Sequence, residues 1–496
     1  MKTLQVDHAI VGAGIAGLWL ARRLLSMGRS VAMIEVGPRS ADGTRPAHPP
    51  LHFPERRNIG AVMARNHMLT GNSSFWGGAL LRNDDPSLRG MFDLGDDAAG
   101  AKALGEFASS YDAVERQLKA PASERSILPQ APHPARLAEV NVLAGRHRNL
   151  ARTVLGSCAE HPQFTLLCPA TVADVELTGD GGIAAMTATS DDGSPVVIRA
   201  AHFVLSAGVI DSNLFVMTHL SRALGDGAQT VGTRLHDHWS LPIARLRWKR
   251  GANLEWLFPP SFRGGFIQGR RVEISAPLPW GEHSGFLHIQ AQYDLVEPYA
   301  TIKRWMAARQ EGQSWFRQAR FVWPLAGQAP RMARIAYNRL VNKRLWLAEG
   351  MELTVVMDFE SFASPHNRLA LDGGEHHLHW DVREQDVSAF EALLCQGTDL
   401  MSHWQKKGGL DLEFLVERET PGAQGEYLRT HAVDAYHLGG GLAVGRNSTR
   451  GLLSPDLRFH KIPNLAVVGT AAFARPGIAN PVETLLALCE RYVSAL

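Results

Sequence analysis

The sequence predicts an α/β fold of the Rossmann type, built from discontinuous pieces, with a second, α+β domain inserted between them. Residues 4–36 follow the order strand, glycine turn, helix, strand. From about residue 241 the pattern changes to longer alternating strands, which predict a separate antiparallel sheet. The last 60 residues return to the first pattern, with a short apolar strand followed by a helix.

Taken in order, the elements divide the chain into five segments. We expect strands at 4–11, 30–36, 164–177, 184–190, 196–200 and 203–206, and helices at 15–27 and over most of 107–155. Further strands are expected at 271–276, 285–293, 352–359 and 465–468, and a last helix at 481–493. The predicted segments are 1–90, 156–240 and 431–496 for the first domain, 91–155 for a helical connection, and 241–430 for the inserted domain.

Composition excludes several classes of protein. Among 496 residues, 45% are hydrophobic and 20% charged, which is typical of globular proteins and not of disordered ones. A net charge of +2 gives no overall signature of nucleic-acid binding, and no apolar run reaches the ~18 residues of a membrane-spanning helix. The four cysteines form no C-x-x-C pair, so we expect neither a structural zinc site nor a disulfide framework. Asp7 and His8 interrupt the N-terminal stretch, so we expect no signal peptide. A cytoplasmic location is expected, with association at the inner face of the membrane as an alternative.

The glycine turn carries a dinucleotide-binding pattern. Gly12, Gly14 and Gly17 form G-x-G-x-x-G around Ala13, Ile15 and Ala16, directly after a strand and at the start of a helix. Glu35 ends the second strand 18 residues after Gly17, where an acidic side chain can bind a ribose hydroxyl. The pattern predicts dinucleotide binding but does not choose between FAD and NAD.

Further segments, in order along most of the chain, resemble the glucose-methanol-choline (GMC) family of FAD-dependent oxidoreductases. They begin with the loop Gly71–Gly78 and the second glycine turn at 206–212, and continue with G-x-x-L-x-D-H at 232–238 and the segment 360–369. Tyr436-His437-Leu438-Gly439-Gly440 follows, and Asn480-Pro481 lies 43 residues after His437.

The resemblance implies FAD as the cofactor. Some sugar oxidases of this superfamily attach FAD through a histidine just before the loop tryptophan; Phe75 stands there, which favours non-covalent FAD. Val467-Val468-Gly469-Thr470 carries glycine where many members have aspartate. The implied FAD-binding residues are Gly12, Gly14, Ile15, Ala16, Gly17, Glu35, Gly71, Asn72, Ser73, Ser74, Trp76, Gly77, Gly78, Val172, Ala207, Gly208, Gly469, Thr470, Asn480 and Pro481.

His437 and Asn480 are the candidate catalytic residues. Alcohol oxidation removes a hydroxyl proton and a hydride, and a neutral imidazole with a pKa of ~6.5 can accept the proton. The resemblance assigns this role to His437 and places Asn480 beside it, against the substrate oxygen. Asn480-Pro481-Val482-Glu483 is also a good helix start, so we expect Asn480 to cap that helix.

Other histidines and a basic segment allow two interpretations each. His377 and His379 would share a strand face and could bind a metal, but a solvated hairpin is the favoured interpretation, and His236 and His238 are expected to be structural. Residues 301–350 hold ten Lys or Arg, two acids and four tryptophans. This composition suits a membrane interface, whereas the simpler interpretation is amphipathic helices that cover the inserted domain.

We expect an FAD-dependent oxidoreductase that acts on a CH–OH group, with a carbohydrate or polyol, free or lipid-linked, as the substrate. Oxygen, a quinone or a protein could accept the electrons. One alternative is a different flavoenzyme, such as a desaturase or an amine oxidase, which would not need the pair formed by His437 and Asn480. The other is a flavin-binding protein without turnover.

Overall fold

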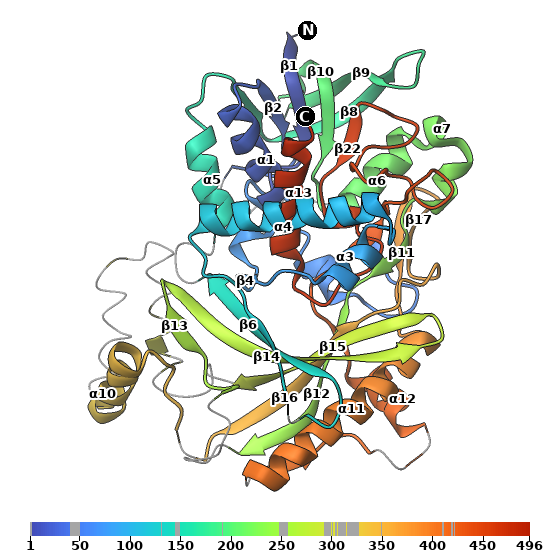
Figure 1. Ribbon diagram of the computed structural model, residues 1–496. Helices are drawn as coiled ribbons and strands as arrows, with labels where there is room; N and C mark the ends of the chain where they lie inside the picture. Colours follow the sequence, from blue (N-terminus) through green and yellow to red (C-terminus); the bar gives the residue numbers. More distant parts are fainter. Residues whose placement is uncertain are drawn as a thin grey trace.

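The computed structural model places two sheets one above the other (Figure 1). The structure describes residues 2–39, 50–129, 131–143, 149–190, 192–247, 256–291, 299, 301–302, 305, 314, 327–348, 350–408, 411–417, 420 and 422–496. No helix among these residues is long and apolar enough to cross a membrane.

The upper sheet has seven strands in the order β7-β2-β1-β10-β9-β8, and β22 also pairs with β10. Strands β7, β2, β1, β10 and β22 run parallel, whereas β8 and β9 form an antiparallel extension. The strands are β1 (Lys2–Val11), β2 (Val31–Ile34), β7 (Phe164–Leu167), β8 (Ala170–Leu177), β9 (Ile183–Ser190), β10 (Pro195–Leu205) and β22 (Leu465–Val467). Three distant parts of the sequence therefore build one Rossmann-like sheet, which confirms the predicted fold class.

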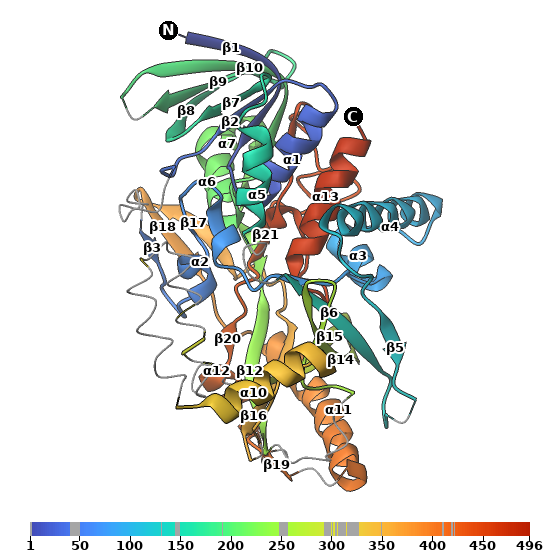
Figure 2. The same cartoon turned by 90° about the vertical axis from the view of Figure 1, so that its left-hand side faces the viewer.

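Helices α1 (Ile15–Ser26) and α13 (Pro481–Ser494) pack together beside this sheet (Figure 2). Helix α1 is buried over most of its circumference, with Leu18, Leu20 and Leu24 among its buried residues, as expected for a helix inside a core. The indole Nε1 of Trp19 donates to Glu490 of α13 over 2.8 Å. The two ends of the chain are thereby fixed to each other.

Among the described residues, the lower sheet has ten strands, with the main order β19-β12-β16-β15-β14-β6-β4. Every pairing along this order is antiparallel. The strands are β4 (Ala79–Leu80), β5 (Arg125–Ile127), β6 (Ala135–Leu143), β12 (His238–Arg247), β13 (Ser261–Arg263), β14 (Phe266–Leu278), β15 (Gly281–Ala291), β16 (Glu352–Glu360), β19 (Asp411–Phe414) and β20 (Val433–Asp434).

One face of the lower sheet packs on α11 (Glu384–Gly408), and α12 (Ala423–His431) lies beside that helix. Leu287, Met357 and Phe359 lie on this face and belong to one buried cluster with Phe390 and Leu393 of α11. Residues alternate between the two faces of a strand, so their immediate neighbours point to the opposite face, towards the upper sheet (Figure 1). The side of this layer that faces the upper sheet therefore carries residues such as Phe286 and Asp358.

The stretch 107–155 is less helical than predicted. Helix α4 (Ala98–Leu118) covers only its first part, α5 (Leu150–Cys158) begins near its end, and strands β5 and β6 lie between them. Strand β6 buries Ala135, Ala138 and Asn141, three residues apart, in a sequence rich in helix-forming residues. Pairing with β14 from Ala135 to Leu143 fixes the extended conformation, so tertiary contacts override the local pattern.

Smaller elements complete the fold. Strands β17 (Arg368–Asp372), β18 (Glu375–His379) and β3 (Leu51–His52) form one small sheet, and β11 (Thr233–His236) and β21 (Gly439–Gly441) another. Gly373 and Gly374 turn β17 into β18 with φ of 56° and 88°, a left-handed pair that glycine adopts freely. The remaining helices are α2 (Ile59–Met63), α3 (Asp85–Met91), α6 (Val209–His219), α7 (Ser221–Leu224), α10 (Ala329–Tyr337), and the short turns η1 (Gly71–Ser74), η3 (Gly225–Thr230), η5 (Asn338–Asn342) and η6 (Thr470–Ala472).

Candidate active site

The first glycine turn joins β1 to α1 and packs against the second glycine turn. Gly12 has φ of 102°, and a Cβ on it would lie 2.6 Å from the carbonyl oxygen of Ser206, so only glycine fits. Glu35 holds the turn from the other side, because its carboxylate accepts the amides of Ala13 and Gly37, each over 2.8 Å. Burial raises the pKa of Glu35, and these two amides oppose that rise. Each carboxylate oxygen still has a second lone pair for a ribose hydroxyl.

Parallel strands β1, β10 and β22 end side by side, which brings three predicted segments together. Val11 pairs with Leu205, and Leu205 with Val467. Crevices at the carboxyl ends of such strands are where α/β sheets bind ligands. A Cβ added to Gly14 or Gly208 would meet no atom within 4 Å, and one on Gly469 would meet only Ala471 N at 4.0 Å. The backbone therefore borders open space at all three glycines.

No side chain caps the N-terminus of α1 at Gly14 or of α6 at Gly208. Their first-turn amides and helix dipoles suit phosphate groups. Together with Glu35 and the open glycine edges, these residues fit the diphosphate and ribose of FAD.

The loop 71–78 lies over the first glycine turn. A Cβ on Gly71 would be 3.3 Å from the Cα of Gly14, and Gly71 and Gly78 adopt φ of 51° and 82°. Within the loop, the Ser73 hydroxyl accepts a hydrogen bond from the backbone amide of Ala151. Trp76 packs on the cluster of Leu80, Leu143 and Phe266. Phe75 is 53% exposed.

Val172 lies in β8 and is 8% exposed. Two residues earlier, the amide of Ala170 donates to the carbonyl oxygen of Glu35 over 2.7 Å. Val172 is thus two residues from the backbone that pairs with Glu35.

His437 is fixed by its backbone. Its amide donates to both carboxylate oxygens of Asp237, over 3.0 and 3.1 Å, and Tyr436 before it adopts φ of 63°, which is rare for a residue with a side chain. After it, a Cβ on Gly439 would lie 2.4 Å from the ring of His236. Gly439 therefore allows close backbone packing after His437, and the bonds to Asp237 fix the position of the His437 backbone from which the imidazole extends.

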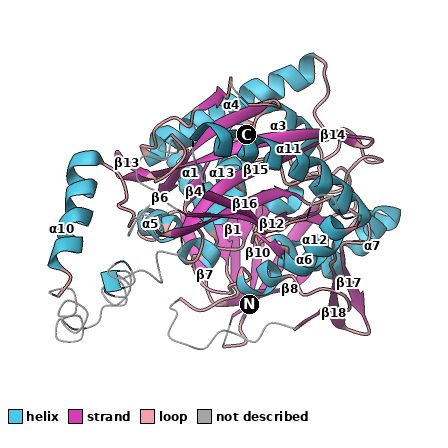
Figure 3. Ribbon diagram, turned by 90° about the horizontal axis from the view of Figure 1, so that it is seen from below, coloured by secondary structure: helices cyan, strands magenta, loops and turns pink. Residues whose placement is uncertain are grey.

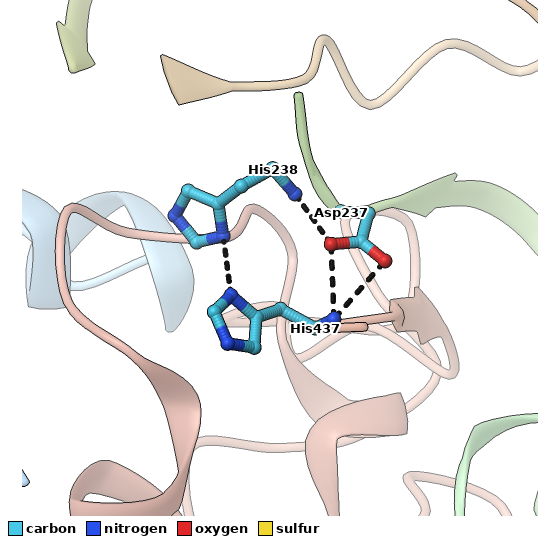
Figure 4. Close-up of side chains that lie close together, drawn as sticks. All are labelled: Asp237, His238 and His437. Atoms are coloured by element: carbon cyan, nitrogen blue, oxygen red, sulfur yellow. Dashed lines mark hydrogen bonds between the residues drawn. The ribbon is translucent and has the colours of Figure 1, made fainter. Parts of the chain in front are cut away.

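The ring of His437 lies between two polar partners, His238 and Asn480. Its Nδ1 is 3.2 Å from Nδ1 of His238, with the two rings nearly perpendicular at 89° (Figure 4). Its Nε2 is 3.2 Å from Nδ2 of Asn480. His437 and Asn480 are thus brought together, although 43 residues separate them.

Asn480 does not cap α13 through its side chain, in contrast to the prediction. The helix begins at Pro481 as expected, but no hydrogen bond joins the Asn480 side chain to its first turn. The amide group instead contacts His437. The local sequence favours a cap, but the neighbouring imidazole provides a competing partner.

Burial, together with the adjacent His238, lowers the pKa of His437 to about 3. Burial likewise lowers the pKa of His238. Both imidazoles are therefore neutral at physiological pH, the form in which a histidine can accept a proton.

Asp237, His238 and His437 are the group among the described residues whose ligand atoms lie within 4.8 Å of one another, as a metal would require. The Asp237 carboxylate, however, already accepts the amides of His238 and His437. Burial and the charge of Asp434 raise its pKa well above the usual range. Hydrogen bonds explain this cluster without an ion.

The lower sheet contributes polar side chains that the sequence did not single out. Glu273, Phe286 and Asp358 lie opposite one another on neighbouring strands, and the Arg271 guanidinium stacks over Phe286 with a distance of 3.8 Å to the ring centroid. Arg271 also donates to the carbonyl oxygen of Ile478, two residues before Asn480, over 2.7 Å. The ring centroid of Phe286, which pairs with Asp358, lies 6.5 Å from that of His238. Nη1 of Arg271 and Oδ1 of Asp358 are buried without a hydrogen-bond partner among the described residues.

Comparison with known proteins gives the family of this fold and site. Residues 363–489 match the family model described as GMC oxidoreductase. No curated protein sequence matches the chain. The structure is similar over 100% of its length to formate oxidase (TM-score 0.56, 13% identity, 98% of that chain covered). Over 99% of its length it is also similar to pyridoxine 4-oxidase from Mesorbium loti (TM-score 0.55, 14% identity, 98% of that chain covered). The same share is similar to an FAD-dependent oxidoreductase from Chaetomium thermophilum (TM-score 0.58, 13% identity, 98% of that chain covered). At these identities, the three structures support the fold alone.

The protein is an FAD-dependent oxidoreductase. Its Rossmann-like sheet carries the glycine turns and open strand ends that suit FAD, and its residues 363–489 match a family model of oxidoreductases. Residues 363–489 match the GMC oxidoreductase family model, in agreement with the resemblance seen in the sequence. Such an enzyme takes electrons from a small-molecule substrate and passes them to an acceptor.

Proposed function

We propose that the enzyme oxidises a CH–OH group to a carbonyl, with His437 as the base and Asn480 as its partner at the substrate oxygen. The observation that carries this proposal is the contact of 3.2 Å between His437 Nε2 and Asn480 Nδ2. A substrate hydroxyl that entered this contact would donate its proton to Nε2 and accept a hydrogen bond from Nδ2. When bound, FAD supplies the acceptor for the hydride from the same carbon.

The proposed FAD-binding residues are those at the three strand ends, the loop 71–78 and the start of α13. The first-turn amides of α1 would hold the diphosphate, and Glu35 a ribose hydroxyl. The α13 N-terminus at Pro481 has no side-chain cap, so its positive end remains available to negative charge. Phe75 favours non-covalent attachment, since phenylalanine offers no nucleophile.

The proposed substrate is polar and carries several hydroxyl groups, as a carbohydrate or polyol does. Support comes from Nη1 of Arg271 and Oδ1 of Asp358, which have no hydrogen-bond partner among the described residues. Both lie on the strands whose Arg271 bonds to the Ile478 carbonyl and whose Phe286 lies beside His238. An unpaired buried polar atom costs about 1–3 kcal/mol, and substrate hydroxyls could pair both: one accepting from Arg271, the other donating to Asp358. An apolar alcohol would leave both unpaired. This favours alcohol oxidation over a desaturase or amine oxidase chemistry, which needs neither hydroxyl recognition nor the pair of His437 and Asn480.

A matched substrate set tests this proposal. Polyols and sugars are compared with monohydric alcohols of similar size, and kcat/KM is measured for wild type, Asp358→Asn and Arg271→Lys. We expect wild type to prefer the polyhydroxy compounds and each variant to raise their KM about tenfold, the value of one lost charged hydrogen bond. Equal kcat/KM for both substrate groups in wild type would contradict the proposed substrate class.

We further propose that α10 and η5 bind an anionic membrane surface. Helix α10 buries no residue and stands at the periphery of the molecule (Figure 3). Tyr337, Leu340 and Val341 are 58, 68 and 59% exposed. Residues 327–348 contain five basic side chains and no acidic one, and Arg331, Arg334 and Lys343 are exposed. Exposed apolar and basic groups on one short amphipathic helix suit an anionic lipid interface.

Sedimentation with vesicles tests this surface. Wild type is compared with Leu340→Ser and with the control Leu371→Ser, whose side chain is also exposed but lies on β17. We expect wild type and the control to sediment with anionic vesicles at low salt, and Leu340→Ser to bind less. No binding of wild type would contradict the membrane proposal. Most of the other Lys, Arg and Trp residues of the segment 301–350 lie outside the described residues.

A further inference from the structure

We propose that His238 is a positioning residue that fixes the tautomer of His437, so that Nε2 of His437 is the nitrogen without a proton. This inference rests on the proposed function, because it concerns the same base. It assigns a role to the histidine of the G-x-x-L-x-D-H segment, which the sequence predicted to be structural.

One backbone carbonyl determines the direction of the whole chain of hydrogen bonds. Nε2 of His238 lies 2.8 Å from the carbonyl oxygen of Gly477, which can only accept, so Nε2 of His238 carries a proton. In a neutral imidazole the other nitrogen is then an acceptor, and Nδ1 of His238 therefore offers a lone pair.

The lone pair on His238 faces Nδ1 of His437 at 3.2 Å. A hydrogen bond across this distance requires the proton to lie on Nδ1 of His437. Its Nε2 is consequently unprotonated, and the neighbouring Nδ2 of Asn480, which is a donor, matches that assignment. In the opposite tautomer of His437, the lone pairs of the two Nδ1 atoms would face each other. Nε2 of His437 would then carry a proton and could not accept one from the substrate.

His238 is itself held rigidly enough to impose this choice. Its amide donates to Asp237 Oδ1 over 2.6 Å, and its residue is 2% exposed at the start of β12. The same Asp237 carboxylate accepts the amide of His437, so one buried side chain sets the distance between the two backbones (Figure 4). Burial lowers the pKa of His238, which keeps its Nδ1 free of a proton.

Two amide variants separate the two nitrogens of His238. In His238→Asn, Oδ1 can stand near the former Nδ1 and still accept from His437. In His238→Gln, the terminal NH₂ can still reach the Gly477 carbonyl, but the acceptor for His437 is lost. His236→Gln is the control, because His236 is equally buried and bonds to the Phe473 carbonyl over 3.0 Å.

The test measures ¹⁵N chemical shifts of the His437 ring in the FAD-loaded, substrate-free enzyme, with the signal assigned by His437→Ala. The rate constant of anaerobic flavin reduction is measured in parallel. We expect wild type, His238→Asn and the control to show an unprotonated Nε2 and rates within a few-fold of one another. His238→Gln should show a protonated Nε2 and a rate about 10²-fold lower, within the range of lost general-base catalysis.

A protonated Nε2 in wild type would overturn the inference, and so would a His238→Gln variant with the wild-type spectrum and rate. The wild-type spectrum alone decides the point if the variants do not fold. If no alcohol reduces the flavin of wild type, the proposed function fails, whereas the spectrum still reports the tautomer.

Discussion

The side chain of Asn480 contacts Nε2 of His437 over 3.2 Å and makes no hydrogen bond to the helix that it precedes. The two residues come from the turn before β21 and from the start of α13.

His437→Ala should retain FAD and slow flavin reduction by about 10²–10⁴-fold, because the base is lost while the glycine turns remain intact. Stopped-flow absorbance gives the rate and the flavin spectrum gives the occupancy. His431→Ala is the control, since that histidine is exposed at the end of α12. A reduction rate near that of wild type in His437→Ala would show that another group takes the proton.

Asn480→Ala should slow reduction with little loss of stability. Removal of a capping asparagine usually costs ~1 kcal/mol, but no capping bond exists here, so we expect a change below about 0.5 kcal/mol in the free energy of unfolding. Asn480→Ser can cap the helix but cannot reach His437. It should be as stable as wild type, measured by chemical denaturation, and as slow as Asn480→Ala; fast turnover by the serine variant would argue against a role for the amide.

FAD should be released from the protein by acid. Phe75 stands where a covalent histidine would be required and is 53% exposed. After precipitation and centrifugation, we expect the yellow cofactor in the supernatant. Flavin retained on the pellet would contradict non-covalent attachment.

Glu483→Gln should stabilise the protein increasingly as pH rises. Burial and the nearby Glu115 raise the pKa of Glu483 to about 8, so its carboxyl stays protonated in the folded protein while the unfolded chain ionises above pH ~4.5. Folding is therefore penalised from pH ~4.5 upwards, and the penalty stops growing near pH 8. We expect the variant to match wild type at pH 5 and to exceed it at pH 9 by roughly 1–3 kcal/mol in unfolding free energy. A stability difference independent of pH would mean that Glu483 is already ionised in the folded state.

The glycine turn, Glu35 and the loop 71–78 could be predicted because each is encoded over a few consecutive residues. His238 and Arg271 could not be assigned in this way, since their partners are distant: His238 meets His437 across 199 positions, and Arg271 donates to the Ile478 carbonyl across 207. The sequence shows Asp237 next to His238, but the direction of the hydrogen bonds through His238 follows only from its contact with the Gly477 carbonyl. Strand β6 was missed because its buried residues recur at a spacing typical of a helix, and only pairing with β14 makes it extended.

The central claim is that a substrate hydroxyl is oxidised at the contact of His437 with Asn480. The most direct test mixes the FAD-loaded enzyme anaerobically with a panel of sugars and polyols and measures flavin absorbance and carbonyl product in one turnover. We predict bleaching of the flavin with one carbonyl formed for each flavin reduced, and bleaching at least about 10²-fold slower in His437→Ala. A flavin that no alcohol bleaches, or that is bleached without carbonyl formation, would contradict the claim.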